Sequence, residues 1–243
     1  MLLGSNPFFS AYRESDLFGQ AIFIGLFLLS IFSWLIILFK VVALRRVRRG
    51  ASYLMRSLPQ KGGNPLNWQP EEGAFLPQNY NLFLEVYQTL QEKCIEILNK
   101  NHMAQAEKGE VHALLSASDI DLMDAQIEMA IADRSIHLEK NLFFLGTTVA
   151  LAPFLGLLGT VWGILITLSE LKTRTLGGSG EVLHGLSMAL ATTVLGLLVA
   201  IPALVGHNYL RAAMRELASD MRSWSAQQLA SIEMLYRRVE TLQ

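Results

Sequence analysis

The stretch that most constrains this chain is residues 152–168, which read APFLGLLGTVWGILITL. It is apolar enough to lie in lipid, yet small and hydroxyl side chains recur along it. On a helix with about 100° per residue, four of them fall within about 60° of one another. These four are Gly156, Thr160, Gly163 and Thr167. Such a strip serves either close packing of helix backbones or the lining of a narrow path, and the spacing alone leaves both interpretations open.

Three windows without Asp, Glu, Lys or Arg are long enough to cross a bilayer, for which about 20 apolar residues suffice, and the third of them holds His184 and His207. We expect membrane-spanning helices over 17–39, 141–168 and 183–208. The composition agrees, because only 17% of the 243 residues are charged, against roughly 25% in soluble domains. The sequence therefore predicts an all-α integral membrane protein.

Basic residues set the expected orientation of these spans. Residues 40–56 hold one lysine and five arginines and no acid, and such an excess marks the cytoplasmic side. The first window is not a cleavable signal peptide, because its apolar run is too long and the positive charge follows it. We therefore expect two external segments, 1–16 and 169–182, and two cytoplasmic ones, a helical domain over 40–140 and a C-terminal helix over 209–243.

The cytoplasmic segment after the first span is predicted to contain a loop and two helices. Residues 59–81 hold four prolines and three glycines, a composition typical of a loop. The first helix is marked by Leu82, Val86, Leu90, Ile97 and Leu98. The second is expected to begin at Ser118 as its N-cap, with an apolar face made of Ile120, Met123, Ile127 and Ile131.

Two further expectations concern the long helices. Residues 110–145 contain neither Pro nor Gly, so we expect the second cytoplasmic helix to continue unbroken into the second span. After the third span, apolar residues follow a 4-3-4-3 spacing, which is typical of a helix that bundles with its own copies. These residues are Leu210, Met214, Leu217, Met221 and Trp224.

The third span repeats the pattern of the second. Its strip consists of Ala189, Thr193, Gly196, Ala200 and Ala203. Pro153 in the second span and Pro202 in the third are expected to loosen the helix backbone locally, as helix kinks. Two threonine-marked strips on neighbouring helices favour a shared polar seam.

No pattern in the chain indicates an enzyme, a metal site or a cofactor. There is no G-x-S-x-G, P-loop or G-x-G-x-x-G motif, and the acidic run 119–128 lacks the glycine and ligand spacing of a calcium loop. The single cysteine, Cys94, excludes an internal disulfide and is interpreted as an inert thiol. A net charge of −1 gives no basic surface for nucleic acid.

Two motifs carry a family resemblance. AP-x-x-GL-x-GTVWGI at 152–164 and ALATTVLGLLVAIPA at 189–203 resemble the MotA/TolQ/ExbB proton-channel family, in its TolQ/ExbB branch. The resemblance implies five copies in the bacterial inner membrane around a dimer of a single-span ExbD- or TolR-like partner. That partner's membrane aspartate would carry protons, and a TonB- or TolA-like protein would pass the motion to the outer membrane. Thr160 and Thr193 match the family's pore threonines.

One position departs from the family pattern. Met188 stands where the family commonly has a glutamate, so the three spans contain no carboxylate. The proton-carrying acid must then come from a partner. His184 lies on the same side of the helix as Met188, but at the outer boundary, where a histidine is usually solvated.

Three functions follow as hypotheses. The favoured one is a proton-channel subunit that couples the proton motive force to a TonB-type or Tol-type system, with the client left open. A flagellar-type stator subunit is an alternative, weakened by three spans instead of four. A non-conducting membrane scaffold is the other alternative, and Met188 is its main support.

Overall fold

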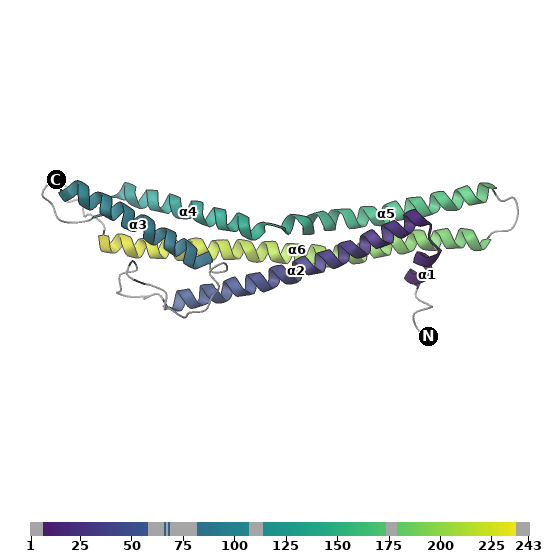
Figure 1. Cartoon of the computed structure of the whole chain (residues 1–243), viewed down its shortest axis with the longest axis horizontal. Coiled ribbons are helices and arrows are strands. Elements are labelled where there is room, and N and C mark those ends of the chain that lie inside the picture. Colours follow the sequence, from purple (N-terminus) through teal and green to yellow (C-terminus); the bar gives the residue numbers. More distant parts are fainter. Residues whose placement is uncertain are drawn as a thin grey trace. The chain divides into compact units, whose positions relative to one another are not determined.

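The computed structural model describes residues 7–57, 66, 68, 82–106, 114–173 and 179–236. This part of the chain is all-helical, as predicted, and Figure 1 shows its helices. They are α1 (Pro7–Glu14), α2 (Leu17–Ser57), α3 (Leu82–Ala106), α4 (Ala117–Glu139), α5 (Leu142–Thr173) and α6 (Ser179–Tyr236).

Helices α2, α5 and α6 are each long and apolar enough to cross a membrane. The candidate spans lie within Leu17–Ser52, Leu142–Ser169 and Gly185–Tyr236. Large apolar side chains on these helices point away from the rest of the chain, among them Phe39, which is 72% exposed. An apolar outer surface of this extent suits lipid or another apolar surface and not water. The prediction of three helices able to span a membrane is confirmed.

The chain divides into two compact units. Unit 1 consists of Met1–Lys40 and Asn141–Arg211, and unit 2 consists of Val41–Lys140 and Ala212–Gln243. Helices α2 and α6 contribute residues to both units.

Unit 1 is built on α1, α5 and the parts of α2 and α6 that belong to it. One apolar cluster joins Ile22 and Leu26 of α2 to residues of α5 and α6. A second cluster contains Ala11 of α1, Phe23 of α2 and Met188 of α6. These clusters hold the N-terminal helices against the α5–α6 pair.

Unit 2 has a larger apolar core, to which α3 and α4 contribute one face each. The predicted faces are confirmed, because Leu82, Val86 and Leu90 of α3 are buried, as are the α4 residues Met123, Ile127 and Ile131. The buried side of α3 is wider than the spacing indicates, since Phe83, Tyr87 and Cys94 are also buried. Helices α2, α4 and α6 all add side chains to this core, so α3 is enclosed from several directions.

Burial explains the chemistry of the single cysteine. Cys94 lies fully inside the core of unit 2. Burial raises the pKa of its thiol to about 11, so the reactive thiolate is nearly absent at neutral pH. The interpretation of Cys94 as an inert thiol agrees with this environment.

Helix α4 begins two residues earlier than predicted. Its N-cap is Ser116 and not Ser118. The backbone N–H of Asp119 donates to the Ser116 hydroxyl at 3.2 Å, and the Ser116 N–H donates to the Asp119 carboxylate at 2.9 Å. The amide of Asn101 on α3 also donates to that carboxylate, at 2.9 Å. The S-x-x-D capping pattern fits both 116–119 and 118–121, and the contact from Asn101 to Asp119 favours the first of the two.

The prediction of one unbroken helix from α4 into α5 is wrong. Helix α4 ends at Glu139 and α5 begins at Leu142. Between them, Asn141 takes a left-handed backbone conformation with φ 75°. Asparagine adopts this conformation more readily than most residues with a side chain. A helix can therefore end here without Pro or Gly.

The apolar residues between 210 and 224, whose 4-3-4-3 spacing predicted a self-bundling helix, are buried within the chain itself. Leu217, Met221 and Trp224 are buried in the core of unit 2. The ring of Trp224 lies 5.8 Å from that of Phe83 and 6.2 Å from that of Tyr87, centroid to centroid. The interpretation of a self-bundling surface is therefore corrected for Leu217, Met221 and Trp224, because these side chains are already buried within unit 2.

Two members of the acidic run of α4 make contacts within the chain. Asp119 caps the helix, and Glu128 pairs with Arg222 at 3.0 Å. In the described part of the chain, no group of three His, Cys, Asp or Glu side chains is arranged to hold a metal ion.

The predicted loops lie largely outside the described residues. From 59–81, only Leu66 and Trp68 are described. Their carbonyl oxygens accept hydrogen bonds from the side chains of Gln91 at 2.6 Å and Tyr87 at 3.4 Å, both on α3. In the predicted external loop 169–182, α5 continues to Thr173 and α6 begins at Ser179.

Candidate functional site

Helices α5 and α6 run side by side and antiparallel in unit 1 (Figure 1). They meet along a line of small residues, which we call the α5–α6 seam. Its members are Ala152, Gly156, Gly159, Gly163 and Thr167 on α5, and Gly185, Ala189, Thr192, Thr193 and Gly196 on α6.

The seam brings the two helix backbones into contact. A Cβ on Gly156 would lie 3.1 Å from the Cα of Thr193. A Cβ on Gly196 would lie 2.6 Å from the carbonyl oxygen of Ala152, closer than nonbonded atoms can approach. Glycine is therefore required at Gly196, and small residues are what allow helices to pack this closely in lipid.

Hydroxyl groups lie in and beside this contact. Thr193 donates a hydrogen bond across the seam to the carbonyl oxygen of Gly156, at 3.2 Å. Thr167 is buried and donates to Gly163 of its own helix at 2.7 Å. Thr160 is half-buried and donates to Leu157 at 2.6 Å. Each hydroxyl oxygen keeps acceptor capacity for water or a carboxyl group.

The structure brings most of the predicted site residues together. Gly156, Gly163, Thr167, Ala189 and Gly196 all belong to the seam, and Thr193 bridges it. Thr160 lies one helical turn from Gly156. Ala200 instead packs in the cluster that contains Ile22 and Leu26 of α2. The contacts within the chain explain the small residues as a packing face, and a pore-lining or partner-facing role stays a prediction.

The two prolines lie inside the helices of the seam. Pro153 is within α5 and Pro202 is within α6, and neither ends its helix. A proline has no N–H for the carbonyl one turn earlier. The predicted local loosening of the backbone is compatible with continuous helices.

Thr192 is a seam residue that sequence reasoning missed. It is fully buried and donates to the carbonyl oxygen of Ala189 at 2.8 Å. A Cβ on Gly159 would overlap the Thr192 side chain, so Gly159 is the space into which Thr192 fits. The adjacent threonines at 192 and 193 were the available signal. Neighbouring residues on a helix point about 100° apart, so Thr192 can point into the contact between the helices while Thr193 lies at its edge.

Met188 does not face an open cavity within the chain. It is 3% exposed and packs with Ala11 and Phe23. A Cβ on Gly19 would overlap the Met188 terminal methyl group and lie 3.0 Å from Oδ1 of Asp16. The ends of the Met188 and Asp16 side chains are therefore near neighbours. The side chain of His184 lies outside the described part of the structure.

Asp16 links the start of α2 to α5. Its carboxylate accepts hydrogen bonds from the N–H of Gly19 at 3.0 Å and from the indole Nε1–H of Trp162 at 2.9 Å. The rings of Phe18 and Trp162 lie 4.4 Å apart. Trp162 of the GTVWGI motif is thus anchored to the N-terminus of α2.

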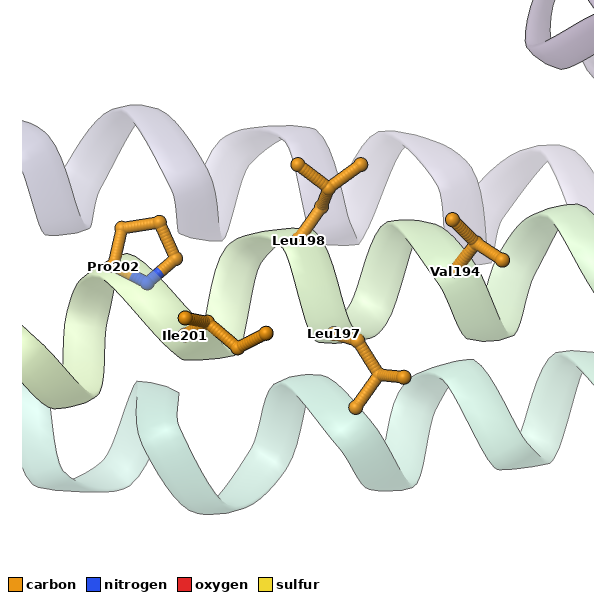
Figure 2. A pocket seen from close by; sticks show the side chains of 5 residues that line it. All are labelled: Val194, Leu197, Leu198, Ile201 and Pro202. Carbon is orange, nitrogen blue, oxygen red and sulfur yellow. The ribbon is translucent and has the colours of Figure 1, made fainter.

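On its outer side, α6 carries a wholly apolar groove of about 330 Å³. Figure 2 shows the five side chains that line it, with Leu197 and Leu198 pointing to opposite sides of the helix. The lining residues are Val194, Leu197, Leu198, Ile201 and Pro202. No polar side chain takes part, so the groove has the chemistry of a lipid-facing or helix-facing surface and not of a substrate site.

Together, the apolar long helices and the hydroxyl-bearing seam define a helical membrane protein. Residues 94–223 match the MotA/TolQ/ExbB proton channel family. This match covers more than half of the 243 residues, and the chain belongs to that family. The resemblance drawn from GTVWGI and AIPA is confirmed, and the family is one of transport channel components and not of enzymes.

Individual relatives agree with this assignment. The chain is 40% identical over 90 residues to the biopolymer transport protein ExbB of Aquifex aeolicus, covering 37% of this chain and 59% of that protein. It is 33% identical over 115 residues to the Tol-Pal system protein TolQ of Pseudomonas aeruginosa, covering 47% and 48%. With ExbB of Pseudomonas putida it is 25% identical over 222 residues, covering 90% and 61%. Each match spans less than two thirds of the relative.

Proposed function

We propose that the chain is an inner-membrane proton-channel subunit, which couples the proton motive force to energised outer-membrane transport or envelope maintenance. One observation carries this proposal beyond family membership. The pair α5–α6 places hydroxyl groups at a backbone-tight contact in spans that contain no carboxylate. A hydroxyl can hydrogen-bond to water or to a carboxyl group without bringing a charge into the membrane.

The acid that carries the proton then belongs to a partner. We assign this role to a single-span ExbD- or TolR-like protein with a membrane carboxylate, next to Thr160 and Thr193. Thr160 supports this placement, because its hydroxyl on α5 is partly exposed. The buried seam residues would hold α5 and α6 at the distance that presents both threonines.

The subunit is proposed to act as an oligomer of five copies around the partner. The apolar groove on α6 and the exposed apolar side chains of α5 supply surface for neighbouring copies or for lipid. Native mass spectrometry of the detergent-extracted protein tests this proposal. A predominantly monomeric species would contradict it.

The orientation follows from charge. The five arginines within 40–56 favour the cytoplasm for residues 40–140 and 209–243, and the periplasm for 1–16 and 169–182. A TonB- or TolA-like protein would indirectly receive the motion that proton flow drives. The relatives include both ExbB and TolQ proteins, so their names favour neither client over the other.

The function is tested by uncoupler-sensitive transport or envelope integrity in cells carrying the chain and its cognate partner. Removing the partner's membrane aspartate should abolish the activity. Equal activity without that aspartate would favour the scaffold hypothesis, for which the apolar, buried Met188 is the specific observation. Stator activity would instead appear as torque in a flagellar motor.

A further inference from the structure

His207 lies where three helices of unit 1 meet, near the point at which α6 passes into unit 2. A Cβ on Gly146 of α5 would lie 3.5 Å from Cε1 and 3.9 Å from Nδ1 of the His207 ring. The preceding residue, Gly206, lies against Ile37 of α2. One edge of the imidazole is therefore in contact with α5, and the preceding residue, Gly206, is in contact with α2.

The two sides of this imidazole have different surroundings. Nδ1 is buried and has no hydrogen-bond partner, whereas the side chain as a whole is only half-buried. A buried nitrogen without a partner costs free energy that an apolar side chain of similar size would not. A histidine at this position therefore needs a reason other than packing.

The charges on the neighbouring turns are basic. On α6, Arg211 follows one turn after His207, and on α2, Lys40 follows about one turn after Ile37. The first turns of α5, residues 142–150, carry no titratable side chain. No carboxylate lies on these turns. A neutral imidazole has one free nitrogen that can accept a proton.

We propose that His207 is the proton-exit residue of the channel, which transfers protons from the path between the spans to water at the Arg211 end of unit 1. This proposal rests on the proposed function. Imidazole is the side chain whose unperturbed pKa, about 6.5, lets it both take up and release protons near neutral pH. In the described part of the three spans, the seam offers only hydroxyls and backbone groups for this task.

The transfer conserves protons and charge. A ring protonated at Nε2 accepts one proton at Nδ1 from a water of the path and becomes an imidazolium. It then releases the Nε2 proton to water on the exposed side, which leaves a neutral ring protonated at Nδ1. Rotation of the ring, or exchange with water, restores the first tautomer.

The test measures proton uptake into liposomes that contain the full chain with its single-span partner, driven by a potassium diffusion potential and read by an internal pH-sensitive dye. His207→Gln keeps a polar side chain that does not titrate, and His207→Ala leaves a space. Both variants should lower the flux at least about tenfold, in line with the loss of a positioned proton-transfer group. Imidazole buffer inside the liposomes should restore flux to His207→Ala, and more strongly as the fraction of free base rises.

Asn208→Ala is the matched control, since Asn208 is an exposed, non-titrating neighbour, and it should conduct like the wild type. Native mass spectrometry must show that every variant assembles. Wild-type flux in His207→Gln, or a low flux in His207→Ala that imidazole leaves unchanged, would overturn the proposal and show a purely structural ring. Absence of partner-dependent flux in the wild type would instead contradict the proposed function.

Discussion

The hydroxyl of Thr193 on α6 donates a hydrogen bond of 3.2 Å to the carbonyl oxygen of Gly156 on α5. This bond crosses between two helices at the point where their backbones are in contact, because a Cβ on Gly156 would lie 3.1 Å from the Cα of Thr193. Thr193 therefore takes part in the packing of α5 against α6 and also places a polar group at the edge of this contact. Packing and a polar path are not exclusive interpretations of this strip.

Because the two helix backbones are in contact at the α5–α6 seam, alanine substitution should cost more stability at a seam glycine than at a glycine elsewhere in the spans. Gly196→Ala should destabilise the protein by about 1–3 kcal/mol, because its Cβ would lie 2.6 Å from the Ala152 carbonyl oxygen and the helices must separate. Gly25→Ala on α2 is the matched control, since its Cβ meets no atom within 4 Å. Thermal unfolding in detergent measures both. Equal melting temperatures for the two variants would show that the seam is not tight.

The two threonines are predicted to differ in how they tolerate replacement. Thr160→Leu should insert and assemble, because Thr160 is half-buried, yet abolish proton coupling by filling the path. At Thr193, Val is the better replacement, because it keeps the shape and removes only the hydroxyl. Cysteines placed at 160 and 193, after replacement of Cys94, should react with water-soluble reagents. Labelling by lipid-soluble reagents alone would place these positions against the bilayer.

Met188→Glu should be poorly tolerated on its own. The new carboxylate would lie beside that of Asp16 and among apolar side chains, and two neighbouring carboxylates resist simultaneous ionisation. Asp16→Asn should restore assembly to the Met188→Glu variant and shift its pH dependence. Yield and oligomer mass of the single and double variants measure this. A Met188→Glu protein that assembles as well as the wild type would indicate that position 188 borders a wet cavity instead.

The α4 capping box predicts a loss of stability in acid. Burial alone would raise the pKa of Asp119, but hydrogen bonds from Ser116 and Asn101 outweigh it, and the pKa is lowered. The ionised group therefore stabilises the fold above the unfolded-state pKa of about 3.9, and this contribution is lost as pH falls through the lower, folded-state value. Asp119→Ala should cost about 1 kcal/mol near pH 7. The difference in the free energy of unfolding between the variant and the wild type should shrink below pH 4. A difference that stays constant with pH would contradict a stabilising role for the ionised Asp119.

Periodicity was enough to predict the spans and the buried faces of α3 and α4, because both depend on which side chains avoid water. Where a local pattern fits more than one position, as S-x-x-D does at 116–119 and 118–121, contacts between helices decide where an element begins. Ser116 caps α4 because Asn101 on another helix contacts Asp119, and α4 ends before Asn141 because that residue takes a left-handed conformation.

The site was predicted from one strip on each helix, but the direction that a strip faces is a tertiary property. Thr192 was missed although it is fully buried in the seam, because the adjacent Thr193 matched the family motif. The apolar residues between 210 and 224 were predicted to contact other copies of the chain, although α3 covers Trp224 at the end of this set. A sequence shows that a face is apolar, and only the packed chain shows what covers it.

The most direct test of the central claim is proton uptake by liposomes that hold the chain with its single-span partner. We predict an uncoupler-sensitive flux that needs both proteins, falls to background when the partner's membrane aspartate is replaced by asparagine, and is lost in Thr160→Leu. A flux that persists without that aspartate, or no flux with both wild-type proteins, would contradict the account of the chain as a proton-channel subunit.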